Sequence, residues 1–442
     1  MKKLLTPSGF PENLPQEQIL ENQFKNIFSS VCESYGYVPL ETPAIEYLET
    51  LSSKGDINKE IYTITRALGE SDSEEKQKRA LRFDLTVPLA RYVGQHYTDL
   101  LFPFKRYQIQ KVWRGERAQK GRFREFYQAD IDVIANAKLP LHFDAEVALI
   151  VAQIFSNFPI HKDIVIHINN RKFLNGLLKD HGVDDFDFAL KTIDKIDKIG
   201  QAEVRVLMLD KLSVKEEAVD SFLKKISKNY PLKEAKIWLE TITTQDEEYK
   251  EGILELLTVF DYLKDFLPKK GVTFIFSPKI ARGLDYYTGT VYETFITGLE
   301  KYGSVCSGGR YANLSERFIN RKLPGVGLSI GLSRLLDIIK NESLVSYPPP
   351  TTSTLLIGFN KEEERGKVNA LAYKFRELGI HTETIHDASF SFGKQKDYAN
   401  KKKVAFLFLE EGNFSFFIDS KRENFNTEQS MFEYIKNERA LY

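Results

Sequence analysis

The chain has 442 residues, of which 42% are hydrophobic and 28% are charged, and its 62 Lys and Arg are balanced by 62 Asp and Glu. This length predicts two or three domains, because single hydrophobic cores stop growing at roughly 250–300 residues. The composition excludes a largely disordered chain, a collagen-like repeat and a small disulfide scaffold. The zero net charge also excludes a uniformly basic surface, so a polyanionic partner must be bound by local clusters of charge.

Two cysteines, Cys32 and Cys306, are too few for a disulfide framework or a cysteine-based zinc site, while a single disulfide stays open. The N-terminal residues 1–5 run directly into Thr-Pro-Ser-Gly, without the apolar segment of a secretory signal. No stretch reaches the roughly 18 consecutive apolar residues of a membrane span. We therefore expect a cytoplasmic protein with no membrane association.

The first part of the chain alternates helical and β patterns. Apolar residues at helical spacing predict a helix over 16–35 that ends at Gly36. Extended segments are expected at 38–43, 61–65, 80–85, 104–112 and 123–134. The last two flank a Gly- and Arg-rich turn, so we expect them to pair antiparallel. The polar stretch 67–79 is expected to be an exposed hairpin loop.

The middle of the chain changes character twice. A helix is expected at 142–155 and a strand at 165–168. Between about 170 and 265 the chain is rich in Lys, Glu and Leu with few Gly, which predicts a helical insertion. Strand and turn patterns resume from 272 to 307, and 325–339 is typical of a strand that turns into a helix.

A proline-rich segment, 346–353, cannot continue a helix and predicts an extended linker. After it, strands are expected at 354–359, 380–385, 404–409 and 414–419, and helices at 362–378, 392–403 and 428–438. This alternation predicts a three-layer α/β domain. The expected organisation is therefore a first domain over 1–345 that contains the insertion, the linker, and a second domain over 354–442.

The densest chemical signal lies between Lys105 and Arg124, where eight basic residues stand against one acid, Glu116. Arginine is suited to bidentate recognition of phosphate, so this cluster indicates a polyphosphate pocket. The alternative is a solvated basic hairpin, which the charge run taken alone favours.

Two further clusters are weaker by themselves. Residues 281–290 place an Arg beside Gly, followed by an Asp and two Tyr, which indicates a fixed cation with phenolic hydrogen-bonding groups; an aromatic strand with an ordinary ion pair is the alternative. Residues 325–334 are rich in Gly, which lets the backbone approach a ligand closely, and an Arg follows at the start of a helix. Their spacing matches neither the phosphate-loop nor the dinucleotide-binding pattern.

Together and in this order, these segments resemble the class II aminoacyl-tRNA synthetases, and specifically the histidyl-tRNA synthetase family. The segment 35–43 is similar to motif 1, the dimer-interface helix and strand, 113–128 to motif 2, and 325–334 to motif 3. Residues 82–88 and 282–287 resemble two blocks that separate this family from other class II synthetases. The resemblance covers essentially the whole chain.

The resemblance implies an α/β fold with an α+β catalytic core. Its parts are a class II antiparallel sheet flanked by helices, a helical insertion, and a C-terminal three-layer α/β domain of the anticodon-binding kind. It also implies a homodimeric enzyme, a histidine–tRNA ligase. Such an enzyme activates histidine with ATP and Mg²⁺ to histidyl-adenylate and pyrophosphate, and then transfers histidine to the 3′ end of tRNA(His).

The resemblance assigns roles residue by residue. It gives catalytic roles to Arg282 and Arg114. It assigns ATP binding to Arg114, Glu116, Arg122 and Arg334. It places Asp84, Thr86 and Gln128 at the histidine α-amino group, Asp132 and Tyr287 at the imidazole, and Tyr286 in the pocket wall. No protein ligand set for a metal is predicted, and Mg²⁺ is expected to accompany ATP.

Two positions depart from the family pattern, because Ala312 stands where a Gly-Gly-Arg-Tyr-Asp block has Asp, and Ser333 stands where many relatives have Glu. The C-terminal domain matches more weakly than the rest. The alternative function is that of a non-catalytic paralogue, such as the regulatory subunit of ATP phosphoribosyltransferase. That family typically lacks the anticodon domain and active-site residues, whereas this chain has both, so the enzyme is favoured.

Overall fold

The computed structural model describes residues 5–52, 60–65, 78–117, 121–265, 271–282, 286–313, 315–418 and 421–438. The chain divides into two compact units. The first consists of Met1–Glu12 and Phe24–Ser346, and the second of Asn13–Gln23 and Tyr347–Tyr442. The first helix, α1 (Pro15–Ser34), contributes residues to both. No described helix combines the length and the apolar composition that crossing a bilayer requires.

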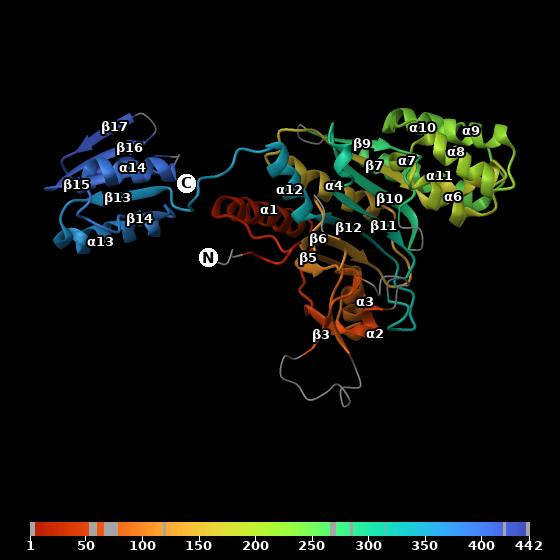
Figure 1. The fold of residues 1–442 in the computed structure, drawn as a ribbon, viewed down its shortest axis with the longest axis horizontal. Helices are drawn as coiled ribbons and strands as arrows, with labels where there is room; N and C mark the ends of the chain where they lie inside the picture. The colour runs from red at the N-terminus through yellow and green to blue at the C-terminus, as the bar shows by residue number, and fades with distance from the viewer. Residues whose placement is uncertain are drawn as a thin grey trace. The chain divides into compact units, whose positions relative to one another are not determined.

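The first unit is built on a large mixed sheet (Figure 1). Among the described residues its strand order is β1 (Val38–Pro39), β5 (Phe104–Trp113), β6 (Glu125–Ile134), β12 (Gly325–Gly331), β11 (Cys306–Tyr311), β10 (Tyr287–Ile296), β7 (Ile164–Asn170), β9 (Val272–Phe276) and β8 (Tyr230–Pro231). Neighbours from β5 to β7 are antiparallel. Only the outer pairs β1–β5 and β7–β9 among these strands are parallel. The expected antiparallel sheet is therefore confirmed, with parallel additions at its edges.

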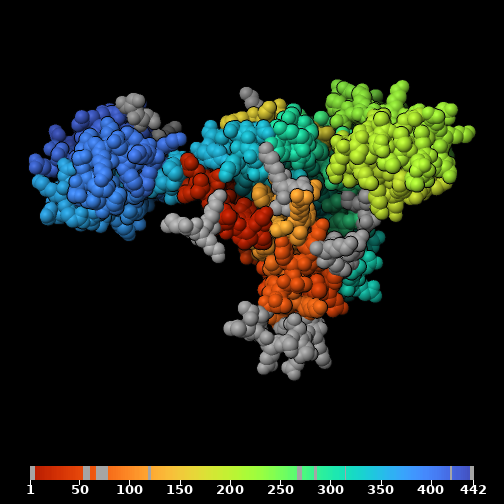
Figure 2. All heavy atoms as spheres, viewed as in Figure 1, coloured from red at the N-terminus to blue at the C-terminus, as the bar shows by residue number. Residues whose placement is uncertain are grey.

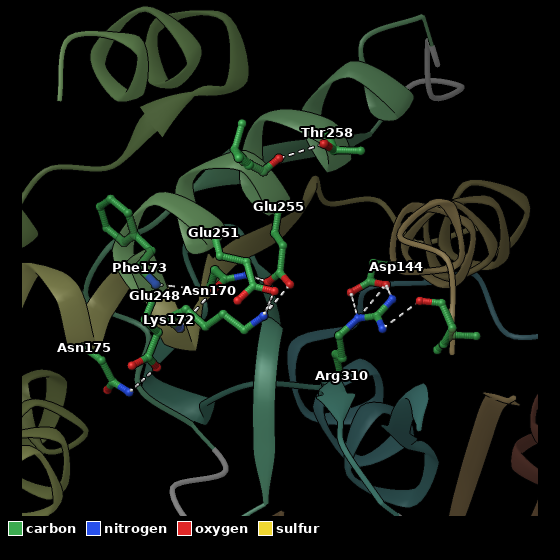
Figure 3. A network of polar contacts seen from close by, with 12 residues as sticks. Asp144, Asn170, Lys172, Phe173, Asn175, Glu248, Glu251, Glu255, Thr258 and Arg310 are labelled. Atoms are coloured by element: carbon green, nitrogen blue, oxygen red, sulfur yellow. Dashed lines mark hydrogen bonds and ion pairs between the residues drawn. The ribbon is translucent and has the colours of Figure 1, made fainter. Parts of the chain in front are cut away.

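One face of this sheet is covered by α4 (His142–Asn157), which packs against β6, β7, β9 and β12. A buried ion pair fixes the contact, because Arg310 of β11 donates from Nε to both carboxylate oxygens of Asp144 at 3.1 Å (Figure 3). The same guanidinium donates to the carbonyl oxygens of Leu139 and Pro140. The opposite face of the sheet is left to carry polar side chains.

The segment expected to be a helical insertion does contain a run of helices (yellow-green in Figure 1). They are α5 (Arg171–Asp180), α6 (Phe186–Ile193), α7 (Ile196–Ile199), α8 (Gln201–Lys211), α9 (Glu216–Ile226), α10 (Leu232–Glu240) and α11 (Glu247–Leu263). The run connects β7 to its parallel neighbour β9. Lys172 of α5 pairs with Glu251 and Glu255 of α11 at 2.8 and 2.7 Å, so charge as well as apolar packing joins its first and last helices (Figure 3).

A small sheet of β2 (Ile45–Tyr47), β4 (Arg79–Leu81) and β3 (Thr63–Ile64) lies in the chain between β1 and β5 of the large one. Helix α2 (Leu48–Leu51) follows β2 directly in the chain. The strand expected to reach residue 85 ends at Leu81, because α3 (Thr86–Gln95) begins directly afterwards. Asp84 causes this change, since its Oδ1 accepts the Val87 N–H at 2.9 Å and so satisfies the first turn of α3. Most of the hairpin loop expected at 67–79, residues 67–77, lies outside the described residues.

Both cysteines are buried and free, so the disulfide left open by the sequence does not form. Between β10 and β11 the short 3₁₀ helix η2 (Glu300–Tyr302) begins the turn, and α12 (Leu332–Glu342) follows β12 directly. The expectation of a strand that turns into a helix over 325–339 is therefore confirmed.

The second unit has a five-stranded sheet in the order β14 (Thr382–Thr384), β13 (Leu355–Phe359), β15 (Ala405–Glu410), β16 (Asn413–Ile418) and β17 (Lys421–Phe425). Its helices are α13 (Arg365–Glu377), which follows the 3₁₀ helix η3 (Glu362–Glu364), α14 (Phe392–Lys402) and α15 (Glu428–Lys436). In Figure 2 the residues of this unit that follow the linker are coloured blue, and their side chains pack into one compact domain.

Ring contacts show the layers of the second unit. Phe392 of α14 contacts Phe406 and Phe408 on one face of the sheet. On the other face Tyr434 of α15 contacts Phe416 of β16, and Phe375 of α13 stacks on Phe432 of α15. The three-layer expectation is therefore confirmed. Strand β17 was not expected, because four of its five residues are polar and exposed and it shows no alternating pattern.

Candidate active site

Polar side chains gather on the face of the large sheet opposite α4. Because side chains alternate along a strand, Gln128, Asp130 and Asp132 of β6 share this face. The register places Ser329 of β12 beside Asp130 and Gly327 beside Asp132. A Cβ atom at Gly327 would lie 2.0 Å from Asp132 Oδ1, so the sheet closes here only because residue 327 is glycine.

A cavity of about 440 Å³ opens on this face. Eight of the residues assigned to the site by resemblance line it: Asp84, Thr86, Arg114, Glu116, Arg122, Gln128, Tyr287 and Arg334. The other three, Asp132, Tyr286 and Arg282, are not part of the lining. The fold thus brings together residues from β6, β10, α12, the start of α3 with the residue Asp84 before it, and the β5–β6 turn.

Arg114 follows β5 and is held in place on two sides. Its Nε donates to the Phe83 carbonyl oxygen at 3.0 Å, and its guanidinium carbon lies 5.1 Å from the centre of the Phe126 ring. Stacking and one fixed hydrogen bond orient the guanidinium plane. The side chain is therefore presented to the cavity in a defined direction.

Three arginines raise the positive potential at one end of the site. Burial lowers the pKa of Arg334, and the charges of Arg122 and Arg282 lower it further. Arg334 Nε is buried and has no hydrogen-bond partner among the described residues. Glu116 offsets part of this charge and lies 3.5 Å from Arg122. A cluster of cations with an unsatisfied N–H is an environment that favours a polyanion.

Arg282 lies on the same sheet face but outside the cavity lining. Its Nε is 2.6 Å from Glu293 Oε1 and 3.2 Å from Asp194 Oδ1. Glu293 lies opposite Ser307 in the β10–β11 register, and Ser307 lies opposite Ser329 in the β11–β12 register. Glu293, the ion-pair partner of Arg282, is therefore in the same cross-strand row as these two serines. The next residues, 283–285, lie outside the described residues.

Gln128 is linked to Asp130 through a serine from another motif. Gln128 Nε2 donates to Ser329 Oγ at 2.9 Å, and Ser329 Oγ donates to Asp130 Oδ1 at 2.5 Å. The oxygen of the same amide, Gln128 Oε1, is buried and has no partner among the described residues. Gln128 therefore lines the cavity and carries a buried hydrogen-bond acceptor that no described residue satisfies.

Asp132 lies behind the cavity, where both carboxylate oxygens already have partners. Its Oδ2 is 2.6 Å from Nη2 of the fully buried Arg106, and its Oδ1 accepts the Tyr311 hydroxyl at 3.1 Å. Tyr286 stacks on Tyr311 and contacts the Tyr287 ring. Burial raises the pKa of Tyr287, so its hydroxyl stays protonated and available for hydrogen bonding at neutral pH. In this arrangement Tyr287 lines the cavity, and Asp132 lies in the layer of side chains behind the lining.

The sequence reasoning did not assign a role to Ser329 or Asp130. Ser329 was one residue of a glycine-rich segment, and the signal that identifies it is the alternation of Gly327, Ser329 and Gly331 on one strand face. Ser333, which departs from the family pattern, links α12 to β6, because its Oγ accepts the Tyr127 backbone N–H at 2.9 Å. Cys306, which the sequence analysis did not assign to the site, is buried in the cavity wall.

The antiparallel sheet flanked by helices, with an arginine-lined cavity on its free face, is the fold of the class II aminoacyl-tRNA synthetases. The family model described as histidyl-tRNA synthetase matches residues 9–335. The histidine–tRNA ligase of Thermobifida fusca is 41% identical over 411 residues, which is 91% of each chain. The chain belongs to the histidyl-tRNA synthetase family, as its motifs indicated.

Solved structures agree with this assignment. The crystal structure of histidyl-tRNA synthetase from Nostoc sp. PCC 7120 has a TM-score of 0.89 and 34% identity, and the similarity covers 99% of both chains. A structure from Bacillus halodurans C, titled as an ATP phosphoribosyltransferase regulatory subunit/histidyl-tRNA synthetase, has a TM-score of 0.70 at 21% identity. It covers 92% of this chain and 98% of its own, and at this identity it shows a shared fold alone.

Proposed function

We propose that the chain activates histidine with ATP and transfers the histidyl group to the 3′ end of tRNA(His). The observation that carries this proposal is the convergence of three arginines, Arg114, Arg122 and Arg334, on one cavity. Gln128 and Tyr287 line the same cavity. Such a cavity has room for a polyphosphate next to a small zwitterion.

We assign the arginines to ATP. Arg114, oriented by the Phe83 carbonyl and the Phe126 ring, would hold the α-phosphate. Arg122 and Arg334 would bind the β- and γ-phosphates, whose oxygens would satisfy the buried Arg334 N–H. Glu116 would lie at the adenine end.

Mg²⁺ would accompany ATP and neutralise charge on its phosphates. Among the described residues, no three His, Cys, Asp or Glu side chains lie together as a metal site. We therefore assign no protein ligand to this ion.

We assign the opposite part of the cavity to histidine. Asp84, Thr86 and the unpartnered Gln128 Oε1 would receive the α-ammonium group. Tyr287 would contact the imidazole. Asp132 would act on the imidazole from the layer behind, where Arg106 and Tyr311 hold its carboxylate. A site that hydrogen-bonds both polar ends of a ligand rejects analogues that lack them by roughly 10⁴–10⁵-fold.

The first step would be an in-line displacement. A carboxylate oxygen of histidine forms a bond to the α-phosphorus, the bond to the β-phosphate oxygen breaks, and pyrophosphate leaves. Arg114 and Arg282 would stabilise the charge that develops around the α-phosphorus, which is a contribution of positioning and electrostatics. In the second step a hydroxyl of the terminal tRNA ribose attacks the histidyl carbonyl, and AMP leaves.

Two assignments concern partners beyond the cavity. We propose that the second unit recognises the tRNA anticodon and that the helical insertion contacts the tRNA. We also propose a homodimer through the segment 35–43. Its strand β1 pairs with β5 and leaves Val38 49% exposed at the sheet edge, as a strand that continues into a second subunit requires.

The test is histidine-dependent exchange of labelled pyrophosphate into ATP by the purified full-length protein. Exchange that depends on histidine and is lost in Arg282→Ala supports the proposal. A folded wild-type protein with no exchange, in the presence of histidine and Mg·ATP, supports the alternative of a non-catalytic paralogue. Charging of tRNA(His) then measures the second step separately.

A further inference from the structure

The hydrogen-bond chain beneath the cavity, Gln128–Ser329–Asp130, has a direction that chemistry dictates. An ionised carboxylate only accepts hydrogen bonds, so the Ser329 hydroxyl must donate its single proton to Asp130. The serine oxygen can then only accept from the glutamine, and the glutamine group that donates is the amide nitrogen, Nε2. Gln128 Oε1 is consequently the amide atom left without a partner among the described residues, on a side chain that lines the cavity.

Among the described residues the Ser329 hydroxyl hydrogen-bonds to Gln128 and Asp130 alone, although Ser307 lies opposite it in the β11–β12 register. The neighbours of Ser329 along the same face of β12 are Gly327 and Gly331, which have no side chains. Gln108 of β5, the partner of Asp130 in the β5–β6 register, donates instead to Thr42 and Gln110. Ser329 is therefore the link through which Asp130 acts on the Gln128 amide.

We propose that Asp130 is a positioning residue that acts through Ser329 to hold the Gln128 amide with its oxygen toward the cavity, where that oxygen accepts from the α-ammonium group of histidine. This inference rests on the proposed function and adds to it the residues that orient the recognition group. If the amide were turned, its NH₂ group would face the ammonium group, and donor would meet donor.

The surroundings of Asp130 make this arrangement sensitive to pH. Burial raises its pKa to about 7, Asp132 and Asp84 add to the rise, and Arg106 and the Ser329 hydrogen bond oppose it. Tyr287 of β10 and Cys306 of β11 also interact with its charge, but both have raised pKa values and stay neutral in this range. A protonated Asp130 can donate to Ser329, which reverses the chain and frees the amide to turn.

The size of the effect follows from the population of the ionised form. The affinity of a ligand for one form falls by the fraction of protein in that form. For a group that titrates near pH 7, the ionised fraction falls about tenfold between pH 8 and pH 6. Protonation of Asp130 removes the form that binds histidine. The affinity for histidine is therefore expected to fall as pH drops through 7 and to reach its full value well above pH 7.

The experiment is steady-state exchange kinetics between pH 6 and pH 8.5, with histidine varied at saturating ATP and ATP varied at saturating histidine. The substrate imidazole titrates in the same range, so the measured quantity is the KM for histidine of the wild type divided by that of Asp130→Asn. We expect this ratio to rise about tenfold from pH 8 to pH 6. The KM for ATP is expected to change less than twofold in either protein.

Serine variants provide the second readout. Ser329→Ala breaks the chain and is expected to raise the KM for histidine about tenfold at pH 8 with the KM for ATP unchanged, whereas Ser329→Thr keeps the hydroxyl and restores most of the affinity. The matched control is Ser277→Ala, which removes a buried hydroxyl bonded to Asn229 Oδ1 at 2.7 Å outside the cavity. The control is expected to leave both KM values unchanged.

The outcomes separate this inference from the proposed function. If the wild type shows no exchange, the proposed function fails. If exchange is present but the ratio stays flat from pH 8 to pH 6, or Ser329→Ala raises the KM for ATP as much as that for histidine, the positioning role is wrong. Should Asp130→Asn not fold, the ratio is taken against Ser329→Ala, in which the link to Asp130 is absent, and the same rise is expected.

Discussion

The ion pair between Asp144 and Arg310 allows a prediction about the stability of the first unit. The Asp144 side chain is completely buried and that of Arg310 is 12% exposed. Arg310→Met keeps the aliphatic stem and removes the guanidinium. Breaking a buried pair by removing one partner costs about 3–5 kcal/mol, because an uncompensated charge remains.

The chemistry of the carboxyl limits this cost and gives it a pH dependence. Burial raises the pKa of Asp144 even beside Arg310, from an ordinary value of 3.8. Without Arg310 the folded protein can always take up a proton instead, which at pH 7 costs about 4 kcal/mol at 1.36 kcal/mol per pH unit. At pH 5 the same proton costs about 2 kcal/mol. Since the folded pKa is raised, the variant is expected to recover stability as pH falls toward the unfolded value.

The assay is urea unfolding followed by tryptophan fluorescence at pH 7 and pH 5. Trp113 and Trp238 both lie in the first unit, so the signal reports on that unit. The double variant Asp144→Asn, Arg310→Met has no carboxylate and is expected to lose the same free energy of unfolding at both pH values. A loss in Arg310→Met below about 1 kcal/mol at pH 7, or an equal loss at pH 5, would refute the reasoning.

Three further predictions concern the site, the thiols and the tRNA. Gly327→Ala places a Cβ 2.0 Å from Asp132 Oδ1 and is expected to lower exchange kcat/KM more than tenfold. Burial raises the pKa values of Cys32 and Cys306, so the native protein at pH 8 is expected to react with Ellman's reagent at neither thiol, and in urea at both. Lys396 lies 4.3 Å from the Phe417 ring and 5.9 Å from the ring of the exposed Phe392, and Arg422 lies over the same Phe417 ring. Lys396→Glu is expected to lower kcat/KM for tRNA charging several-fold and to leave exchange unchanged.

Each of these predictions has a control or a contrary outcome. Gly366→Ala adds a Cβ with no atom within 4 Å and is expected to leave exchange unchanged; equal effects of the two alanines would remove the steric explanation. Rapid reaction of a thiol in the native protein would contradict the burial of the cysteines. Lys367 lies exposed on α13, on the other face of the second sheet. If Lys367→Glu impairs charging as strongly as Lys396→Glu, the effect is one of net charge and not of the surface around Lys396.

Local pattern was sufficient for most elements and failed where tertiary contacts set the boundary. The hairpin of β5 and β6 follows from alternation and an Arg- and Gly-rich turn, and the structure has it in antiparallel register. The strand expected at 80–85 was too long, because the Asp84 carboxylate captures the Val87 N–H and starts α3. Strand β17 was missed, since its place comes from pairing with β16 and not from apolar alternation.

The sequence by itself determined the family and the residue types of the site, because ordered motifs and an arginine-rich turn are properties of the chain. Only the tertiary structure decided which of those residues share the cavity. It placed Asp132 behind the cavity, where the carboxylate pairs with Arg106 and accepts a hydrogen bond from Tyr311. It also joined Asp130 to Ser329, 199 positions away. The physical reason is that sheet register brings distant strands side by side, and a hydrogen bond depends on that register rather than on separation along the chain.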